Sequence, residues 1–360
     1  MMHSNVEPPR PWCGRTPLLT VIWDWDGREP MDLPDQDTLP LDLLRHPAGG
    51  RDGEWALLGE EERDEGLDVV ESVHFMLRRL IHTNSDFARA ALYGLALEQP
   101  VVTYADRLLE RLAHIHRDDL LPHARWLVSE AAHREPLKLG MLLLGLSGRH
   151  DDLVDLRALA RHDELTLFAL KATELLCDDP TDLWWEIARK ARGWGRVHAV
   201  KRLSEVVYDR PDVRAWLIRY GCWNTVAPDH LAWICADAGD LVSVLERSLV
   251  DRATLEGASL ILGTLARTSY DGDMDAYEDG AEATLLFLEH VEARSDLEAF
   301  VPTLQALIRW VSWPDAIERG AEPWKRRIAQ GWGDAQRARV LQSCRKLLAV
   351  HDEGQPSQRA

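Results

Sequence analysis

From residue 66 onward, apolar side chains recur at spacings of three and four residues, which is the pattern of a helix with one buried face. The first such stretch contains Val70, Val73, Leu77 and Leu80. Strict alternation of apolar and polar residues, which would indicate a strand, never extends beyond a few positions after that point. The pattern therefore predicts an all-α fold over residues 66–351.

A second regularity lies in the starts of these helices. Asp152, Asp182, Asp212 and Asp240 recur at intervals of 30, 30 and 28 residues, each followed by an apolar residue. A carboxylate at the N-cap or in the first turn accepts the free amides of a helix and favours its positive end. The interval predicts a repeated helical unit of about 30 residues.

Each unit also contains a second, more apolar helix, and a short helix pair cannot bury its apolar face alone. Such units are stable only when they stack on their neighbours, as in a solenoid. The second helices are expected at residues 137–146, 165–172, 195–202, 230–236 and 258–265.

The stretch from about 84 to 270 resembles the short-repeat bacterial type of HEAT-like α-solenoid. The resemblance rests on Asp182-Leu-Trp-Trp and on Gly195-Arg-Val-His-Ala-Val-Lys-Arg-Leu203, an acidic start followed by the family's second-helix pattern. It implies a right-handed α-solenoid of HEAT-like helix pairs with a concave binding wall, most often a protein-binding scaffold. HEAT-like folds also include DNA glycosylases and lyases that attach bilin chromophores, so an enzyme remains the alternative.

Residues 1–65 differ from the rest because they contain eight prolines and a Gly49-Gly50 pair. Proline removes an amide donor and interrupts helices. We expect an irregular, acidic leader with at most one short strand, partly ordered on the first repeat. Residues 352–360 are expected to be a disordered tail.

The net charge of −18 is concentrated in two segments. Residues 1–65 carry fifteen acids and six arginines, and residues 271–298 carry ten acids and Arg294. The rest of the chain is neutral on balance. Clustered Lys and Arg are needed for nucleic-acid affinity, so nucleic acid is an unlikely partner. The acidic segments either keep the protein soluble or form a docking surface for a protein with a basic surface.

The five cysteines (Cys13, Cys177, Cys222, Cys235 and Cys344) are odd in number and widely spaced. This usage is typical of free thiols in a reducing compartment. The apolar runs fall short of the roughly 20 residues of a membrane span, and the N-terminus has no pattern of a secretory signal. We expect a cytoplasmic protein without membrane insertion or a cofactor.

The acidic stretch at residues 271–282 has the ligand spacing of an EF-hand loop, which the family uses to bind calcium. Ala276 stands where the loop's sharp turn needs glycine, and no second loop of this kind occurs. We interpret the stretch as a solvated hinge, with a weak calcium site as the alternative. Its side-chain ligands would be Asp271, Asp273, Asp275, Asp279 and Glu282.

Two His-Asp pairs, His150-Asp151 and His162-Asp163, resemble the signature of HD-type metal-dependent phosphohydrolases. Both pairs precede apolar helices, so their carboxylates already serve as helix caps. A metal-dependent hydrolase is therefore a third hypothesis, behind the scaffold and the other enzymes.

Six of the fifteen tryptophans lie between residues 184 and 233. Most fit a core between repeats, but tryptophan and arginine are also the residues that anchor interfaces. Trp194 lies in a Gly-Trp-Gly turn that looks exposed. We predict a binding patch formed by Trp184, Trp185, Trp194, Arg196 and Arg202.

No P-loop, GxSxG or HExxH motif occurs, and no cysteine is paired with histidine in a catalytic pattern. Repeats without a catalytic constellation favour a non-catalytic scaffold that binds a protein. The sequence does not identify that protein.

Overall fold

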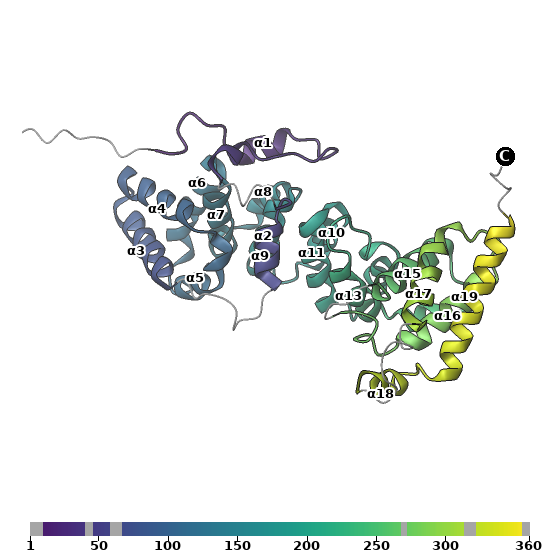
Figure 1. The fold of residues 1–360 in the computed structure, drawn as a ribbon. Coiled ribbons are helices and arrows are strands. Elements are labelled where there is room, and N and C mark those ends of the chain that lie inside the picture. The colour runs from purple at the N-terminus through teal and green to yellow at the C-terminus, as the bar shows by residue number, and fades with distance from the viewer. Residues whose placement is uncertain (1–9, 40–45, 58–66, 268–271, 313–321, 355–360) are drawn as a thin grey trace, which may run out of the picture. The chain divides into compact units, whose positions relative to one another are not determined.

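A computed structural model describes residues 10–39, 46–57, 67–267, 272–312 and 322–354. The described residues form α-helices, short 3-10 turns and one π turn, and no strand occurs among them. The all-α prediction is confirmed, and a strand in the described part of the leader is not found. The chain divides into two compact units, residues 1–199 and 200–360, which are described separately (Figure 1).

Eleven α-helices begin within the described residues of unit 1, and the last of them continues past residue 199 into unit 2. They are α1 (Leu18–Asp24), α2 (Gly50–Leu57), α3 (Leu67–Thr83), α4 (Asp86–Glu98), α5 (Ala105–Leu112), α6 (Arg117–Glu130), α7 (Arg134–Ser147), α8 (Leu153–Leu159), α9 (Asp163–Leu176), α10 (Thr181–Lys190) and α11 (Gly193–Val206).

The centre of unit 1 is α7, which packs against both α6 and α9. Nearly every residue of α7 is buried, including its charged first turn. The contact with α9 is close because a Cβ at Gly145 would lie 2.8 Å from the Cα of Ala172. Glycine at this position lets the two backbones approach.

The leader folds onto unit 1 rather than remaining irregular throughout. Its helix α1 packs on α6 and α8, α2 packs on α9, and a 3-10 turn spans Pro34–Thr38 (Figure 1). The amide of Leu18 donates to the carbonyl of Ala131, and Arg161 donates to the carbonyls of Ile22 and Trp25. The predicted irregular leader therefore has two helices that sequence reasoning missed.

Unit 2 continues the helical pattern with α12 (Pro211–Trp216), a π turn (Leu217–Gly221), α13 (Asp229–Gly239), α14 (Leu241–Leu245), α15 (Arg252–Leu265), α16 (Gly280–Glu292), α17 (Val301–Ser312), α18 (Glu322–Ala329) and α19 (Asp334–Gly354). Its core is built around α15, which packs on α13, on the π turn and on α17. The side of α15 that carries Gly257 meets the π turn so closely that a Cβ there would lie 2.1 Å from the carbonyl oxygen of Ile218.

The predicted helix starts are found. Asp152 and Asp240 occupy the N-cap positions of α8 and α14, and Asp182 and Asp212 lie in the first turns of α10 and α12. All five predicted second helices lie within α7, α9, α11, α13 and α15. No described helix is both long enough and apolar enough to cross a membrane.

Candidate functional site: a charged cavity in unit 1

A lysine lies at the centre of unit 1 with no exposed surface. The Nζ atom of Lys138 lies 2.5 Å from Oδ2 of Asp52, 2.9 Å from Oε1 of Glu135 and 2.6 Å from Oε1 of Glu164. These carboxylates come from α2, α7 and α9, so one ammonium joins three segments of the chain. An ammonium has three donors, and all three are used here.

Two arginines extend this network. The guanidinium of Arg51 donates to Asp52 at 3.0 Å and to Glu135 at 2.7 Å. Arg134 forms a two-pronged pair with Asp35, whose carboxylate also accepts the backbone amide of Arg134 at 2.8 Å. The partners Asp35 and Asp52 both belong to the leader, so buried charges attach the leader to α7.

Backbone amides satisfy the remaining oxygens of the two inner glutamates. Val101 donates its amide to Oε2 of Glu135 at 2.7 Å, and Gly49 donates to Oε2 of Glu164 at 2.9 Å. Hydrogen bonding of this kind is what makes a buried carboxylate tolerable. The network is therefore a complete set of ion pairs rather than an isolated group of charges.

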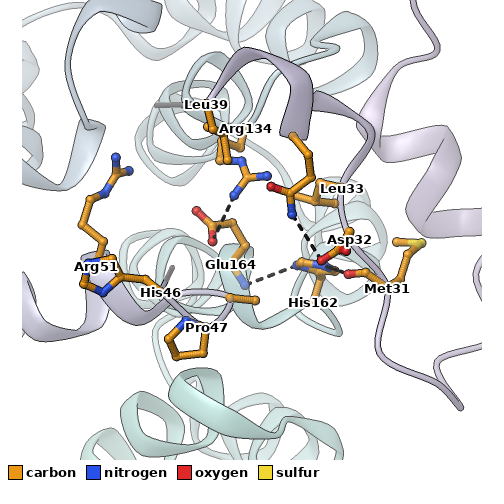
Figure 2. A pocket seen from close by; sticks show the side chains of 12 residues that line it. Met31, Asp32, Leu33, Leu39, His46, Pro47, Arg51, Arg134, His162 and Glu164 are labelled. Carbon is orange, nitrogen blue, oxygen red and sulfur yellow. Dashed lines mark hydrogen bonds and ion pairs between the residues drawn. The ribbon is translucent and has the colours of Figure 1, made fainter. Parts of the chain in front are cut away.

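A cavity of about 380 Å³ adjoins the network (Figure 2). The cavity lies between the leader and the N-terminal ends of α7 and α9. Its lining residues are Met31, Asp32, Leu33, Gln36, Leu39, His46, Pro47, Ala48, Arg51, Arg134, His162 and Glu164. Its volume is within the range of small-molecule sites, and its wall combines charged and apolar groups.

The protonation of the network follows from these contacts. Burial alone would lower the pKa of Lys138, but Asp52, Glu135 and Glu164 together raise it well above its usual value. Burial would raise the pKa of Glu164, yet Lys138 and Arg134 outweigh it and lower that pKa to about 2. Lys138 therefore stays protonated at neutral pH and is unsuited to act as a nucleophile or a general base.

His162 in the cavity wall is held as a neutral ring. Its Nε2 lies 2.8 Å from the carbonyl oxygen of Met31 and must donate to it, so its Nδ1 accepts the amide of Glu164 at 3.3 Å. Burial is the main reason that the pKa of His162 is lowered. Because both ring nitrogens are occupied, this His-Asp pair does not offer the metal ligand that the hydrolase hypothesis requires.

One group of three side chains in the described residues has the spacing of metal ligands, namely Asp52, Glu135 and Glu164. These are the three carboxylates that surround Lys138. The ammonium takes the central position that a cation would need, and it supplies the compensating positive charge itself. The group is accordingly explained as an ion-pair cage.

The residues of the predicted tryptophan patch do not form an exposed surface. Trp184 and Trp194 are buried, and the indole of Trp184 donates to Thr173 at 3.1 Å. Trp194 packs against α2, where a Cβ at Gly53 would lie 2.4 Å from its ring. The expected exposure of Trp194 is therefore wrong, because the leader helix covers it.

The other three residues of that patch are partly buried. The guanidinium of Arg189 lies 4.8 Å from the ring centre of Trp185, and Arg196 donates to the carbonyl of Ala188 at 3.1 Å. Arg202 is half-buried in α11. A binding role for these residues stays a prediction.

The predicted calcium ligands are placed as follows. Asp271 lies outside the described residues. Asp273 accepts the amides of Asp275 and Ala276, and the Asp275 carboxylate pairs with Arg327. Among the described carboxylates of this stretch, including Asp279 and Glu282, no three come within ligating distance of one another. The hinge and the weak calcium site both stay predictions.

The charged cavity was missed at the level of sequence, although one signal was present. Lys138 lies within an expected apolar helix, and a lysine on a buried helix requires nearby carboxylates. Its neighbour Glu135 could have been proposed from the three-residue spacing. Asp52 and Glu164 could not, because nothing in the sequence indicates which distant segment lies against α7.

Comparison with known proteins gives no family assignment. No family model matches this chain, and neither the curated proteins nor the solved structures searched contain a match. The site is therefore interpreted from its own geometry.

Proposed function

We propose that this chain is a non-catalytic, HEAT-like helical protein that binds another protein, and that unit 2 carries the binding surface. The observation that supports this is a run of exposed aromatic side chains between residues 208 and 233. Tyr208 is 85% exposed, Trp223 68%, Tyr220 47% and Trp233 37%. Large aromatic side chains that remain accessible are frequent anchors of protein interfaces.

The chemistry of unit 1 supports binding over catalysis. The inner charged groups, Asp52, Glu135 and Glu164, are paired with Lys138, the lysine stays protonated and His162 is neutral with both nitrogens engaged. A general acid or base needs an accessible proton and a pKa near the working pH. Groups that are held in buried ion pairs have neither an accessible proton nor a pKa near neutral pH.

The acidic side chains of unit 2 favour a basic partner. The stretch at residues 272–298 belongs to this unit and carries nine acids and one arginine. Charge complementarity raises the rate of association and weakens with salt. The proposed partner is therefore a protein with a basic contact surface.

The test uses the double variant Tyr208→Ala, Trp223→Ala. Proteins retained by the intact chain from its native host are identified, and the affinity of the purified partner is then measured for the wild type and the variant. We expect a loss of at least ~10-fold in affinity, about 1.4 kcal/mol, because interface aromatics commonly contribute that much.

The matched control is Phe75→Ala, since Phe75 is an exposed aromatic residue of unit 1 at 61%. It should leave the affinity unchanged, and all variants should unfold at the same temperature. An unchanged affinity of the double variant, with its fold intact, would reject unit 2 as the binding surface.

A further inference from the structure

Three polar atoms around the charged cavity remain open after the network is complete. The Nη1 atom of Arg51 has no hydrogen-bond partner within the described part of the chain, because its Nε and Nη2 atoms make the contacts to Asp52 and Glu135. The Nη1 atom of Arg134 forms an ion pair with Oε2 of Glu164 at 3.4 Å, and it makes no hydrogen bond among the described residues. Both guanidinium groups therefore keep N–H donors that the hydrogen bonds of the network do not use.

The third open atom is an acceptor. Gln36 lines the cavity and donates its amide to Asp32 at 3.2 Å, while its Oε1 is buried with no partner among the described residues. Native proteins rarely leave a buried polar atom without a partner, because the lost hydration is costly. An unpaired buried acceptor in a cavity wall suggests a donor that arrives with a ligand.

The polar groups of the lining are distributed across the cavity, with Glu164 beside Arg134 near its middle (Figure 2). Arg51 and His46 lie on one side of the cavity, whereas Asp32 and Met31 lie on the other, and Arg134 lies between them. The lining thus offers donors at one end and acceptors at the other. A ligand that carries both charges would match both ends at once.

The overall charge around the cavity argues against a simple anion. Five carboxylates (Asp32, Asp35, Asp52, Glu135 and Glu164) face three cations (Arg51, Arg134 and Lys138). A phosphate would be repelled by this excess of negative charge, and a simple amine would be repelled by the two guanidinium groups. A molecule with a carboxylate and an ammonium avoids both penalties.

We propose that the cavity of unit 1 binds a small zwitterion, a free amino acid, with its carboxylate on the guanidinium edges of Arg51 and Arg134. Its ammonium donates to Gln36 Oε1 and is compensated by Asp32. A guanidinium matches the planar geometry of a carboxylate. The proposed ligand site is formed by residues of unit 1 and the aromatic surface by residues of unit 2, so either proposal can be disproved alone.

The experiment is calorimetric titration of the full chain with each of the twenty common L-amino acids. We expect one or a few to bind with a dissociation constant below ~1 mM. The amide and the N-acetyl derivative of the binding amino acid each lack one charge and should bind at least ~10-fold more weakly. Inorganic phosphate should not compete.

The variant Asp32→Asn tests the ammonium end. Asp32 is exposed, and among the described residues its side chain accepts a hydrogen bond from Gln36 alone, so the fold should tolerate the change. We expect amino-acid affinity to fall ~5- to 10-fold. The control Asp26→Asn changes a comparable leader carboxylate that lies outside the cavity wall and accepts the amide of Arg28.

The outcomes are decisive in either direction. If no amino acid binds, if the amide and N-acetyl derivatives bind as well as the parent, or if Asp32→Asn matches Asp26→Asn, the proposal is wrong. Loss of amino-acid binding in Tyr208→Ala, Trp223→Ala would also contradict it, since those residues belong to unit 2.

Discussion

The two units bury different kinds of side chains. Unit 1 encloses Asp35, Asp52, Arg134, Glu135, Lys138 and Glu164 in a single charged network. In the described part of unit 2, Arg327 is the charged residue that is buried, and its partner Asp275 remains partly exposed. The core of unit 2 is otherwise apolar or contains hydroxyl groups, such as the Ser259–Thr303 pair at 3.0 Å.

This difference reflects how each unit closes its core. In unit 2, successive helices pack on their neighbours through apolar contacts, and the hydrophobic effect that drives them has no preferred direction. In unit 1, a leader from a distant part of the sequence is fixed by ion pairs that require one geometry. Buried ion pairs add little stability over apolar contacts, but removing one partner is strongly destabilising. Deleting the leader would therefore disturb unit 1 itself.

The largest expected effect is that of Lys138→Met. Removing the ammonium leaves three buried carboxylates without their shared cation, and we expect the free energy of unfolding to fall by about 3–5 kcal/mol. Arg327→Met in unit 2 should lower the free energy of unfolding by less, because the partly exposed carboxylate of Asp275 can be hydrated once the arginine is removed. Urea unfolding followed by circular dichroism measures both.

The control for that pair is Lys190→Met, which breaks an exposed ion pair with Glu186. Exposed pairs contribute about 0–1 kcal/mol, so this variant should resemble the wild type. If Lys138→Met and Arg327→Met lowered the free energy of unfolding equally, the two units would not differ in how strongly they depend on a buried cation.

A smaller effect, located in unit 2, is expected from Gly257→Ala. The new Cβ would meet the backbone oxygen of Ile218, which cannot rotate away, so we expect a cost of about 1–3 kcal/mol. The control is Gly94→Ala on α4, where no atom lies within 4 Å of the added carbon. That change should stabilise the protein by about 0.5–1 kcal/mol through helix propensity. Thermal unfolding of the two variants distinguishes a close backbone contact from an ordinary helical glycine.

In unit 1, the buried carboxyl of Asp163 is expected to make stability depend on pH. Asp163 accepts the amide of Arg192 at 3.3 Å, and burial raises the pKa of its carboxyl to about 7. The folded state therefore holds a proton that the unfolded state has lost between about pH 4 and pH 7, so this group lowers stability as pH rises through that window.

Asp163→Asn keeps the acceptor oxygen and removes the titration. We expect the variant to match the wild type near pH 4 and to exceed its stability by pH 8, with a slope of up to ~1.4 kcal/mol per pH unit in the difference. The difference in stability between variant and wild type is measured because other groups also titrate. Burial lowers the pKa values of His123, His133 and His162, and these histidines raise stability as pH rises. A difference that does not vary with pH would refute the raised pKa of Asp163.

The parts of the fold that could be predicted are local ones. The spacing of apolar residues located α7, α9, α11, α13 and α15, and the recurring aspartates marked helix starts. The two leader helices were missed because eight prolines outweighed the short apolar run in α1. Trp194 was misjudged because flanking glycines suggested exposure, whereas Gly53 of α2 packs on its ring.

The sequence by itself determined that this chain is helical, that aspartates at four helix starts are spaced 28 to 30 residues apart and that its charge is concentrated in two segments. These properties depend on neighbours within one or two helical turns. Only the tertiary structure decided which charges meet. The contacts Asp52–Lys138, Asp35–Arg134 and Gly49–Glu164 join residues 86, 99 and 115 positions apart. Such contacts form only after the core has excluded water, and the periodicity that defines a helix contains no information about which segment will lie against it.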